Sequence, residues 1–283
     1  MLDEFNSSDV ILFHWRDIDI RDQPTDKLFD QKWVLYNMES PMYTYMSYPN
    51  RLFNIRLFES IDWTMTYRTD SDIYIPYGTI TKCQQKWRPK VKPFRTKRRS
   101  IAWVVSNCET ASKREYFVDQ IKTLMEVDVF GACGTYECSR SDDSCFKYIE
   151  KHYKYYLAFE NSLCKDYVTE KLFHSLNYDI IPVVYGVANY SSILPPNSYI
   201  DALKFITVSQ LVDHLNQVAN DQNLYESYFQ WKHYYCVQNS NDFCQLCQYI
   251  NEYIYKSSDN SVNRDIVKWW VNDAHCRSIK FAK

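Results

Sequence analysis

Glycine is rare in this chain, with only 4 positions among 283 residues. No GxGxxG or GxxxxGK(S/T) run can be read in the sequence, which excludes the dinucleotide-binding Rossmann fingerprint and the phosphate-binding P-loop. There is also no signal peptide and no apolar run of the ~20 residues that a membrane helix requires. The formal net charge of −2 argues against a protein-wide field for nucleic acids.

Aromatic residues and cysteines are abundant instead. The 25 tyrosines, 15 phenylalanines and 8 tryptophans suit stacking on sugars and bases, although core filling accounts for most of them. Ten cysteines indicate an oxidising compartment. They include one group in a polar loop and a second near the C-terminus: Cys133, Cys138 and Cys145, then Cys236, Cys244, Cys247 and Cys276.

Two further patterns concern metals and glycans. Cys244 and Cys247 have the spacing of half a zinc site, but no second CxxC or HxxxH completes it, and the six histidines are scattered. We therefore expect no zinc. N-glycosylation sequons begin at Asn6 and Asn189, which agrees with a lumenal location.

The chain divides into two halves. Short apolar runs at 10–13, 33–36, 52–57 and 73–75 predict strands of a first sheet. Residues 82–99 hold nine basic residues, no acidic one and two prolines, which is typical of an exposed interdomain linker. A nucleic-acid patch and a protease site are the alternative interpretations of this stretch.

The second half alternates strand-like and helix-like segments. Strands are predicted at 101–105, 127–130, 155–159 and 180–184, and helices at 114–125, 167–177 and 209–218. This alternation is typical of βαβ units, which form a parallel sheet with helices on both faces. Substrates of such sheets lie in the crevice at the carboxyl ends of the strands.

The most informative segment is FENSLCKDYVTEKLF at 159–173. It follows a predicted strand and opens a predicted helix, for which Asp166 is a candidate N-cap. Tyr167, Glu170 and Lys171 then stand at i, i+3 and i+4, so a ring, a carboxylate and an ammonium share one helical face. Such a group at a helix start suits a nucleotide diphosphate. A solvated Glu–Lys face is the plainer alternative.

This segment closely resembles the donor-binding signature of the α1,3-fucosyltransferases, the family that uses GDP-fucose. Other family-like segments occur in family order and cover nearly the whole chain, at 14–18, 39–41, 63–73, 76–78, 104–107, 182–184 and 228–231. The resemblance implies an α/β fold of GT-B type, in which two Rossmann-like domains face a crevice. Because the first strand follows Met1 almost at once, we expect the N-terminal domain to be incomplete.

Under this resemblance we expect four parts. They are a partial acceptor-side domain at 1–82, the basic linker at 83–99, a GDP-fucose-binding domain at 100–245 and a disulfide-rich tail at 246–283. Family members are usually Golgi proteins with an N-terminal membrane anchor and a stem. A lumenal Golgi location is therefore implied, with contact to the membrane only through an anchor that this chain lacks.

Glu39 is the predicted general base. It follows the strand at 33–36 and precedes Pro41, so its carboxylate stands at the carboxyl end of a strand, where substrates collect. The glutamate of the family's Glu-Ser-Pro segment, which matches Glu39, is the proposed base that takes the proton of the acceptor hydroxyl. The alternative is a surface glutamate in a turn.

The predicted donor-binding residues lie in the second half. Arg114 opens a helix after the loop that contains Asn107, and by resemblance it binds the β-phosphate or the fucose end of the donor. Lys171 supplies a charge for the diphosphate, and Glu170 accepts hydrogen bonds from the ribose. Tyr167 contributes its ring, and the guanine or sugar side is assigned to Tyr156, Glu160 and Asn161. Glu160 and Asn161 have an alternative role, in which they tie the end of the strand.

Asp70-Ser71-Asp72 has the DxD spacing that binds Mn²⁺ or Mg²⁺ in other transferases. Because it stands inside a segment that resembles metal-independent fucosyltransferases, we expect it to order the chain before 73–75. No cofactor is predicted to be essential.

The predicted reaction is transfer of L-fucose, with inversion, to the 3-hydroxyl of N-acetylglucosamine in N-glycans. The cysteine-rich loop resembles that of invertebrate and core-type members, which favours the innermost N-acetylglucosamine, with N-acetyllactosamine of the antennae as the alternative. Two other functions remain open. One is a module that binds GDP-fucose without transferring it, and the other is a secreted, disulfide-rich recognition protein.

Overall fold

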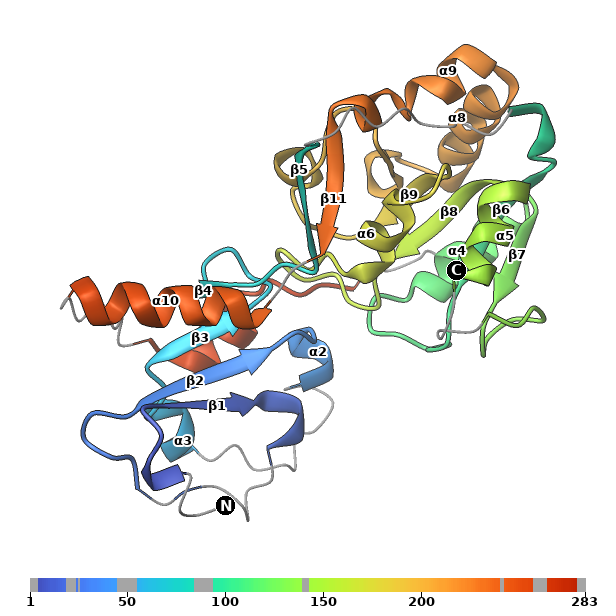
Figure 1. Ribbon diagram of the computed structural model, residues 1–283. Coiled ribbons are helices and arrows are strands. Elements are labelled where there is room, and N and C mark those ends of the chain that lie inside the picture. Colours follow the sequence, from blue (N-terminus) through green and yellow to red (C-terminus); the bar gives the residue numbers. More distant parts are fainter. Residues whose placement is uncertain are drawn as a thin grey trace. The chain divides into compact units, whose positions relative to one another are not determined.

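The computed structural model describes residues 5–18, 24, 26–44, 55–83, 94–138, 143–239, 242–256 and 264–278. It separates into two compact units, and each is described by itself below (Figure 1). The first unit comprises residues 1–76, 164–167 and 240–276, and the second comprises 77–163, 168–239 and 277–283. The expected tail at 246–283 is therefore mostly part of the first unit. Residues 77–82, expected in the first domain, belong to the second.

The first unit is built on a four-stranded sheet in which every pairing is parallel. Its strands follow chain order: β1 (Val10–His14), β2 (Lys32–Asn37), β3 (Trp63–Thr66) and β4 (Ile73–Tyr74). Three of them match predicted strands. β3 had no predicted strand, because its sequence alternates large apolar residues with threonines that are also buried.

Helix α10 (Asp242–Lys256) supplies much of the apolar cover of this sheet (Figure 1). The ring of Trp63 lies 5.2 Å from that of Tyr249 and 4.9 Å from that of Tyr253, both edge-on. Val34, Met65 and Leu246 belong to the same buried cluster. A helix distant in sequence therefore completes the core of the N-terminal sheet.

One predicted strand of this unit was wrong. The run at 52–57 ends inside a helix, α3 (Ile55–Glu59), while 52–54 lie outside the described residues. The physical reason is topological: β2 and β3 are parallel neighbours, and a parallel pair needs a crossover connection, which is usually helical. A second short helix, α2 (Pro41–Thr44), follows β2 directly.

The second unit holds a five-stranded parallel sheet of order β10-β9-β8-β6-β7. Its strands are β6 (Arg99–Val104), β7 (Val127–Phe130), β8 (Tyr153–Phe159), β9 (Ile181–Tyr185) and β10 (Ile200–Asp201). The first four were predicted, within a few residues at their ends. The parallel α/β architecture expected from the alternating pattern is confirmed.

Helices cover both faces of this sheet. One buried cluster joins it to α4 (Arg114–Lys122), α8 (Val208–Asn220) and α9 (Gln222–Ser227), and the other joins it to α5 (Ser144–His152) and α6 (Glu170–Leu176). A short helix, α7 (Tyr190–Ile193), follows β9. An antiparallel ribbon of β5 (Gly78–Lys82) and β11 (Tyr235–Asn239) flanks α6.

The strand order fixes where this unit should bind a ligand. From β6 the chain goes to β7 on one side, then crosses to β8 on the other. The order therefore reverses between β6 and β8, and ligands of open α/β sheets bind beyond the carboxyl ends of strands at such a switch point. The loops at 105–113 and 160–169 lie at this position.

Four disulfides join Cys83 to Cys236, Cys108 to Cys133, Cys138 to Cys145 and Cys164 to Cys276. Each lies within one unit. Cys244 and Cys247 are exposed on α10 and take part in none of these bonds. In the described part of the chain, no helix combines the length and apolar composition needed to cross a membrane.

The predicted linker is only partly described, since 84–93 lie outside the described residues. Lys97 departs from the expected exposed character, because it is buried and its ammonium donates to the carbonyls of Glu150 and Tyr153 at 2.5 and 3.1 Å.

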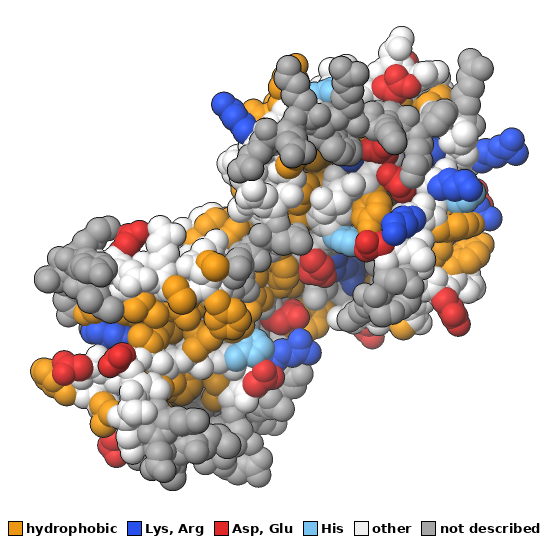
Figure 2. Space-filling view, viewed as in Figure 1, with side chains coloured by type: hydrophobic (Ala, Val, Ile, Leu, Met, Phe, Trp, Pro, Cys, Tyr) orange, Lys and Arg blue, Asp and Glu red, His pale blue; other side chains and the backbone are white. Residues whose placement is uncertain are grey.

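Side chains of both charges are interspersed over the face seen in Figure 2, in keeping with the net charge of −2.

Candidate functional site

Arg114 lies at the switch point of the second unit, at the first position of α4. Its side chain is buried, and its guanidinium donates to the carbonyl of Phe159 at 2.5 Å and to that of Asn107 at 3.2 Å. The Arg114 guanidinium therefore joins the end of β8 to the loop after β6. The structure brings Arg114 and Asn107 together as predicted, with the Asn107 side chain exposed.

Ser112 completes this frame and was not predicted. Its hydroxyl donates to the carbonyl of Glu160 at 2.7 Å, and its N–H donates to that of Asn161 at 2.9 Å. The hydroxyl of Tyr185 in β9 in turn donates to the carbonyl of Ser112 at 3.0 Å. The carboxyl ends of β8 and β9 are therefore tied to the loop after β6. A single serine in a loop gives no sequence signal for such a role.

Glu160 is fully buried behind this frame. Its carboxylate accepts from the N–H of Thr169 at 2.8 Å and from the Thr169 hydroxyl at 2.9 Å, and it lies 3.4 Å from the ammonium of Lys171. Burial raises the pKa of Glu160, and Lys171 opposes that rise. This geometry matches the tying role that the sequence left open for Glu160.

Helix α6 begins later than predicted. Thr169 is its N-cap, with its hydroxyl accepting from the N–H of Lys171 at 3.4 Å, and Glu170 is its first residue. Asp166 instead has a φ of 60°, and its carboxylate accepts from the N–H and hydroxyl of Thr69 at 3.1 and 2.7 Å. The prediction of Asp166 as the cap was wrong, since aspartate and threonine both favour caps. Tyr167 consequently shares no helical face with Glu170 and Lys171.

Lys171 is surrounded by acceptors. Its ammonium donates to the Thr169 hydroxyl at 2.8 Å and to Glu170 at 3.2 Å, besides its approach to Glu160. Burial acts to lower the pKa of Lys171, but the carboxylates of Glu160 and Glu170 outweigh it and raise the pKa. Lys171 therefore stays cationic, with its charge already balanced by two carboxylates.

The other predicted donor residues occupy different surroundings. Tyr156 is buried in the core against Phe146, with ring centroids 5.2 Å apart, and burial raises its pKa. Asn161 stands at the end of β8, where its buried side-chain oxygen has no hydrogen-bond partner among the described residues. An unsatisfied acceptor at a switch point is a candidate ligand contact.

Glu39 lies in the first unit, just beyond β2. Its N–H donates to the side-chain oxygen of Asn37 at 3.2 Å, and the Asn37 amide donates back to the Glu39 carbonyl at 3.1 Å. Asn37 is fully buried, so this reciprocal pair fixes the backbone of Glu39. Pro41 then opens α2, as the fixed φ of proline favours at a first helical position.

The carboxylate of Glu39 is held more loosely than its backbone. Arg16 donates to one oxygen at 3.4 Å, and the Tyr167 hydroxyl donates to the other at 3.4 Å. The side chain is 33% exposed. Arg16 was not predicted as a site residue, although it stands in the family-like segment at 14–18.

Tyr167 thus belongs to the surroundings of Glu39 within the first unit. Its buried ring lies 5.0 Å from that of Tyr67, which lies 5.7 Å from that of Trp270. The Cys164–Cys276 disulfide and a hydrogen bond from Lys165 N–H to the carbonyl of Ala274, at 2.8 Å, fix the same segment. Part of the signature segment therefore packs beside the predicted base.

Asp70 and Asp72 have separate partners. The guanidinium of Arg68 donates to both oxygens of Asp70 at 2.9 and 2.7 Å, and Lys165 donates at 3.0 Å. Although burial acts to raise it, these cations lower the pKa of Asp70 to about 2. Asp72 accepts from the N–H and hydroxyl of Thr64 at 2.8 and 2.6 Å. Among the described residues, no group of three or more metal-ligating side chains converges.

Comparison with known proteins agrees with this geometry. The profile "Glycosyltransferase family 10 (fucosyltransferase) C-term" matches residues 94–269, and "Fucosyltransferase, N-terminal" matches residues 2–78. Alpha-(1,3)-fucosyltransferase C of Drosophila melanogaster is 38% identical over 95% of this chain and 67% of its own length. Glycoprotein 3-alpha-L-fucosyltransferase A of the same species is 35% identical over 96% of this chain, which spans only 53% of that relative.

A crystal structure of an alpha1,3-fucosyltransferase shares the fold, with a TM-score of 0.57 at 15% identity over 91% of this chain and 81% of that one. The two parallel sheets therefore define a GT-B-type glycosyltransferase fold. The chain belongs to glycosyltransferase family 10, the α1,3-fucosyltransferases whose sugar donor is GDP-fucose.

Proposed function

We propose that the chain transfers L-fucose from GDP-fucose, with inversion, to the 3-hydroxyl of N-acetylglucosamine in an N-glycan. The observation that carries the proposal is the meeting of Arg114, Asn161 and the start of α6 at the switch point, inside the segment matched by the family profile. A fixed cation and an unsatisfied acceptor there suit a sugar nucleotide, which offers phosphate oxygens and donor groups.

In the proposed reaction, the acceptor hydroxyl gives its proton to the Glu39 carboxylate as its oxygen attacks C1 of fucose. The bond from C1 to the phosphate oxygen breaks, and its electron pair leaves with GDP. The sugar passes through an oxocarbenium-like state. Arg114 and Lys171 stabilise the charge that develops on the departing diphosphate.

Glu39 suits the base role because its backbone is fixed while its carboxylate is reachable. Its two carboxylate contacts, each at 3.4 Å, are at the long end of hydrogen bonding. Exchanging one of them for an acceptor hydroxyl costs little. The contact that remains, from Arg16 or from Tyr167, holds the carboxylate in place.

Donor binding is proposed to use the exposed Glu170 carboxylate for the ribose hydroxyls. Glu170 contacts Lys171 at 3.2 Å and is 62% exposed. When the Glu170 carboxylate turns to the ribose, it leaves the Lys171 ammonium. That ammonium can then donate a hydrogen bond to the phosphate oxygens. Asn107 and Asn161 are assigned to the guanine or sugar side, whereas the buried Tyr156 supports the end of the strand from behind.

The transfer is proposed to need no metal ion, because Arg68 and Lys165 already pair with Asp70, and Thr64 with Asp72. A Golgi lumenal location is proposed on the four disulfides and the exposed sequon residues Asn6 and Asn189. The acceptor is a glycoprotein, with either the core or an antennal N-acetylglucosamine as the site.

The test is a transfer assay on the oxidised chain, with labelled GDP-fucose, a panel of defined N-glycans and excess chelator. We expect an α1,3-linked fucosyl product, and the preferred glycan separates core from antennal acceptors. GDP affinity without any product would instead identify a donor-binding module. Absence of GDP affinity would contradict both and favour a recognition protein.

A further inference from the structure

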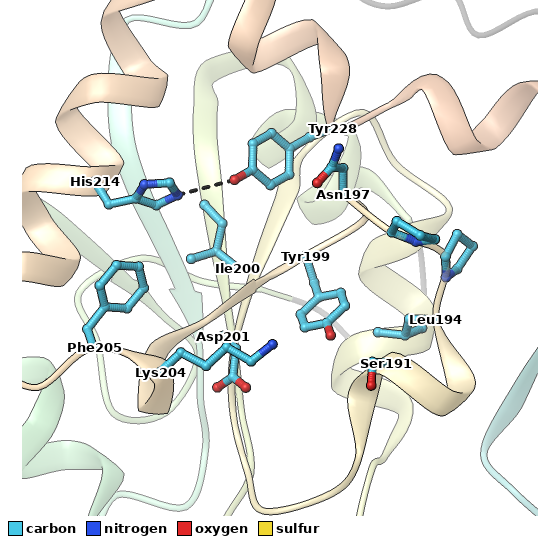
Figure 3. A pocket seen from close by; sticks show the side chains of 12 residues that line it. Ser191, Leu194, Asn197, Tyr199, Ile200, Asp201, Lys204, Phe205, His214 and Tyr228 are labelled. Atoms are coloured by element: carbon cyan, nitrogen blue, oxygen red, sulfur yellow. Dashed lines mark hydrogen bonds between the residues drawn. The ribbon is translucent and has the colours of Figure 1, made fainter.

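A cavity of about 370 Å³ lies in the second unit beside β10, the edge strand of the five-stranded sheet (Figure 3). Its walls come from the segment after α7, from β10 and the turn that follows it, and from α8. None of its lining residues belongs to the loops after β6 and β8. The proposed fucosyl transfer therefore leaves this cavity without a role.

Aromatic rings form one part of the wall (Figure 3). The ring of Phe205 lies 5.3 Å from that of His214, and Nε2 of His214 lies 3.2 Å from the hydroxyl of Tyr228. Burial lowers the pKa of His214 below its ordinary value, which favours the neutral ring. Tyr199 stands across the cavity from this group in Figure 3. Rings of this kind combine a large apolar face with a polar tip.

Two opposite charges lie in the same cavity. Asp201 accepts from the N–H of Leu203 at 3.0 Å through one oxygen only, and the Lys204 ammonium lies 6.0 Å from the centre of the Tyr199 ring. The second Asp201 oxygen and the Lys204 ammonium have no hydrogen-bond or ion-pair partner in the described part of the chain. Each is available to a ligand, one as an acceptor and the other as a donor.

These charges restrict the ligand. One carboxylate and one ammonium together carry no net charge, so the cavity favours neither a cation nor an anion, and a neutral molecule is complementary to it. Its polar groups must donate to the carboxylate and accept from the ammonium, and a hydroxyl does both. Its remaining surface must lie against aromatic rings. We propose that this cavity binds a neutral saccharide, with hydroxyls bonded to Asp201 and Lys204 and a ring face packed on the aromatic wall.

The volume supports this proposal, since cavities that bind small ligands begin at about 300 Å³. The saccharide has two possible sources. Ser191, the third residue of the Asn189 sequon, lines the cavity, and its hydroxyl donates to the side chain of exposed Asn189 at 2.8 Å. A glycan on Asn189 would thus start next to the cavity, and the other source is a glycan on a separate molecule.

The test is saturation-transfer NMR with N,N′-diacetylchitobiose, on the chain secreted with its glycans and on Asn189→Gln. We expect saturation transfer from Asn189→Gln, and an affinity about tenfold weaker in the further variants Asp201→Asn and Lys204→Ala. Asp201→Asn keeps an acceptor for Leu203 and so preserves the turn. The matched control is Lys122→Ala, which removes an exposed lysine of α4 paired with Asp119 at 3.3 Å.

No saturation transfer from Asn189→Gln, or transfer that neither cavity substitution weakens, would overturn the proposal. Transfer confined to Asn189→Gln identifies the chain's own glycan as the occupant. Equal transfer from both proteins, weakened in each by the cavity substitutions, identifies a glycan of another molecule. GDP titrations on the same samples report on the donor loops separately, so failure here and failure of the proposed function are distinguishable.

Discussion

Glu39 and Glu160 are glutamates at the carboxyl ends of strands in two parallel sheets, and their surroundings differ. Glu39 is 33% exposed, and its two carboxylate contacts measure 3.4 Å. Glu160 is fully buried and bonded to Thr169 at 2.8 and 2.9 Å. The first carboxylate is free to exchange a partner for substrate, whereas the second fixes the start of α6. In the proposed function, the environment of each carboxylate, and not its residue type, separates the base Glu39 from the structural Glu160.

The largest effect should follow from Glu39→Gln. Glutamine keeps the shape of the side chain but cannot take a proton, so kcat should fall by ~10²-fold or more, the usual weight of a general base. Steady-state kinetics at saturating donor and acceptor, together with thermal unfolding, would measure this. Retention of more than a tenth of the wild-type turnover by a folded variant would remove Glu39 from the mechanism.

Lys171→Ala should destabilise the second unit. The substitution leaves the buried Glu160 carboxylate without its cation, while Thr169 still donates to it. We expect the free energy of unfolding to fall by about 2 kcal/mol. Urea unfolding would measure this, and the exposed pair of Lys122 and Asp119 provides the control, since Lys122→Ala should cost less than about 1 kcal/mol. Equal losses in the two variants would show that Glu160 does not depend on Lys171.

Tyr167→Phe should act on the base and not on the donor. It removes the hydroxyl that lies 3.4 Å from Glu39 and keeps the ring that packs on Tyr67. We expect kcat to fall by about threefold to tenfold, the size of one modest hydrogen bond, with the GDP dissociation constant unchanged. A weakened GDP affinity with normal kcat would return Tyr167 to the donor site that the sequence predicted.

The smallest effect concerns acid stability. The pKa of Asp70 is about 2 when folded, against an ordinary value of 3.8. A lowered folded pKa means that the stabilising contribution is present above about pH 4 and is lost as the pH falls toward 2. Asp70→Asn should therefore be slightly less stable than wild type at pH 7, and the difference should shrink as the pH falls through 2. A difference that has the same size at pH 7 and at pH 2 would assign the loss to packing. Because Asp70 is 39% exposed, we expect less than about 1 kcal/mol.

Much of the second unit could be predicted from the sequence, because its strands are apolar runs separated by helical periods. β3 could not, since Thr64 and Thr66 are buried beside Trp63 and Met65 and find their partners in Asp72 and Ser71. The hydroxyls of these threonines are hydrogen-bonded to a loop that comes later in the sequence, which lets them be buried. The strand therefore has no continuous apolar run by which it could be predicted. The place of α10 on the first sheet depends on contacts between distant parts of the sequence, and no local pattern records these.

The candidate site was predicted in its residue types more than in its arrangement. Arg114 opens α4 and Glu39 follows β2, both as expected, because local patterns in the sequence fix these positions. Tyr167 and Asp166 were placed on a helix that begins only at Glu170, since two capping residues three positions apart compete in the sequence. Arg16 contacts Glu39, and Ser112 contacts the carbonyl of Glu160. Both partners are distant in the sequence, so the residues next to Arg16 and Ser112 do not predict these contacts.

The account's central claim is that the second unit holds the donor while Glu39 acts only in the chemical step. An equilibrium titration with GDP tests it most directly, on wild type, Glu39→Gln, Glu160→Gln and the double variant Glu160→Gln with Lys171→Ala. We predict unchanged affinity for Glu39→Gln. The double variant should bind GDP at least about tenfold more weakly than Glu160→Gln alone. Both proteins lack the Glu160 carboxylate, so the difference between them reports on the contact of Lys171 with the donor and not on its structural pairing with Glu160. Weakened GDP binding by Glu39→Gln would contradict the account, as would equal GDP binding by Glu160→Gln and the double variant.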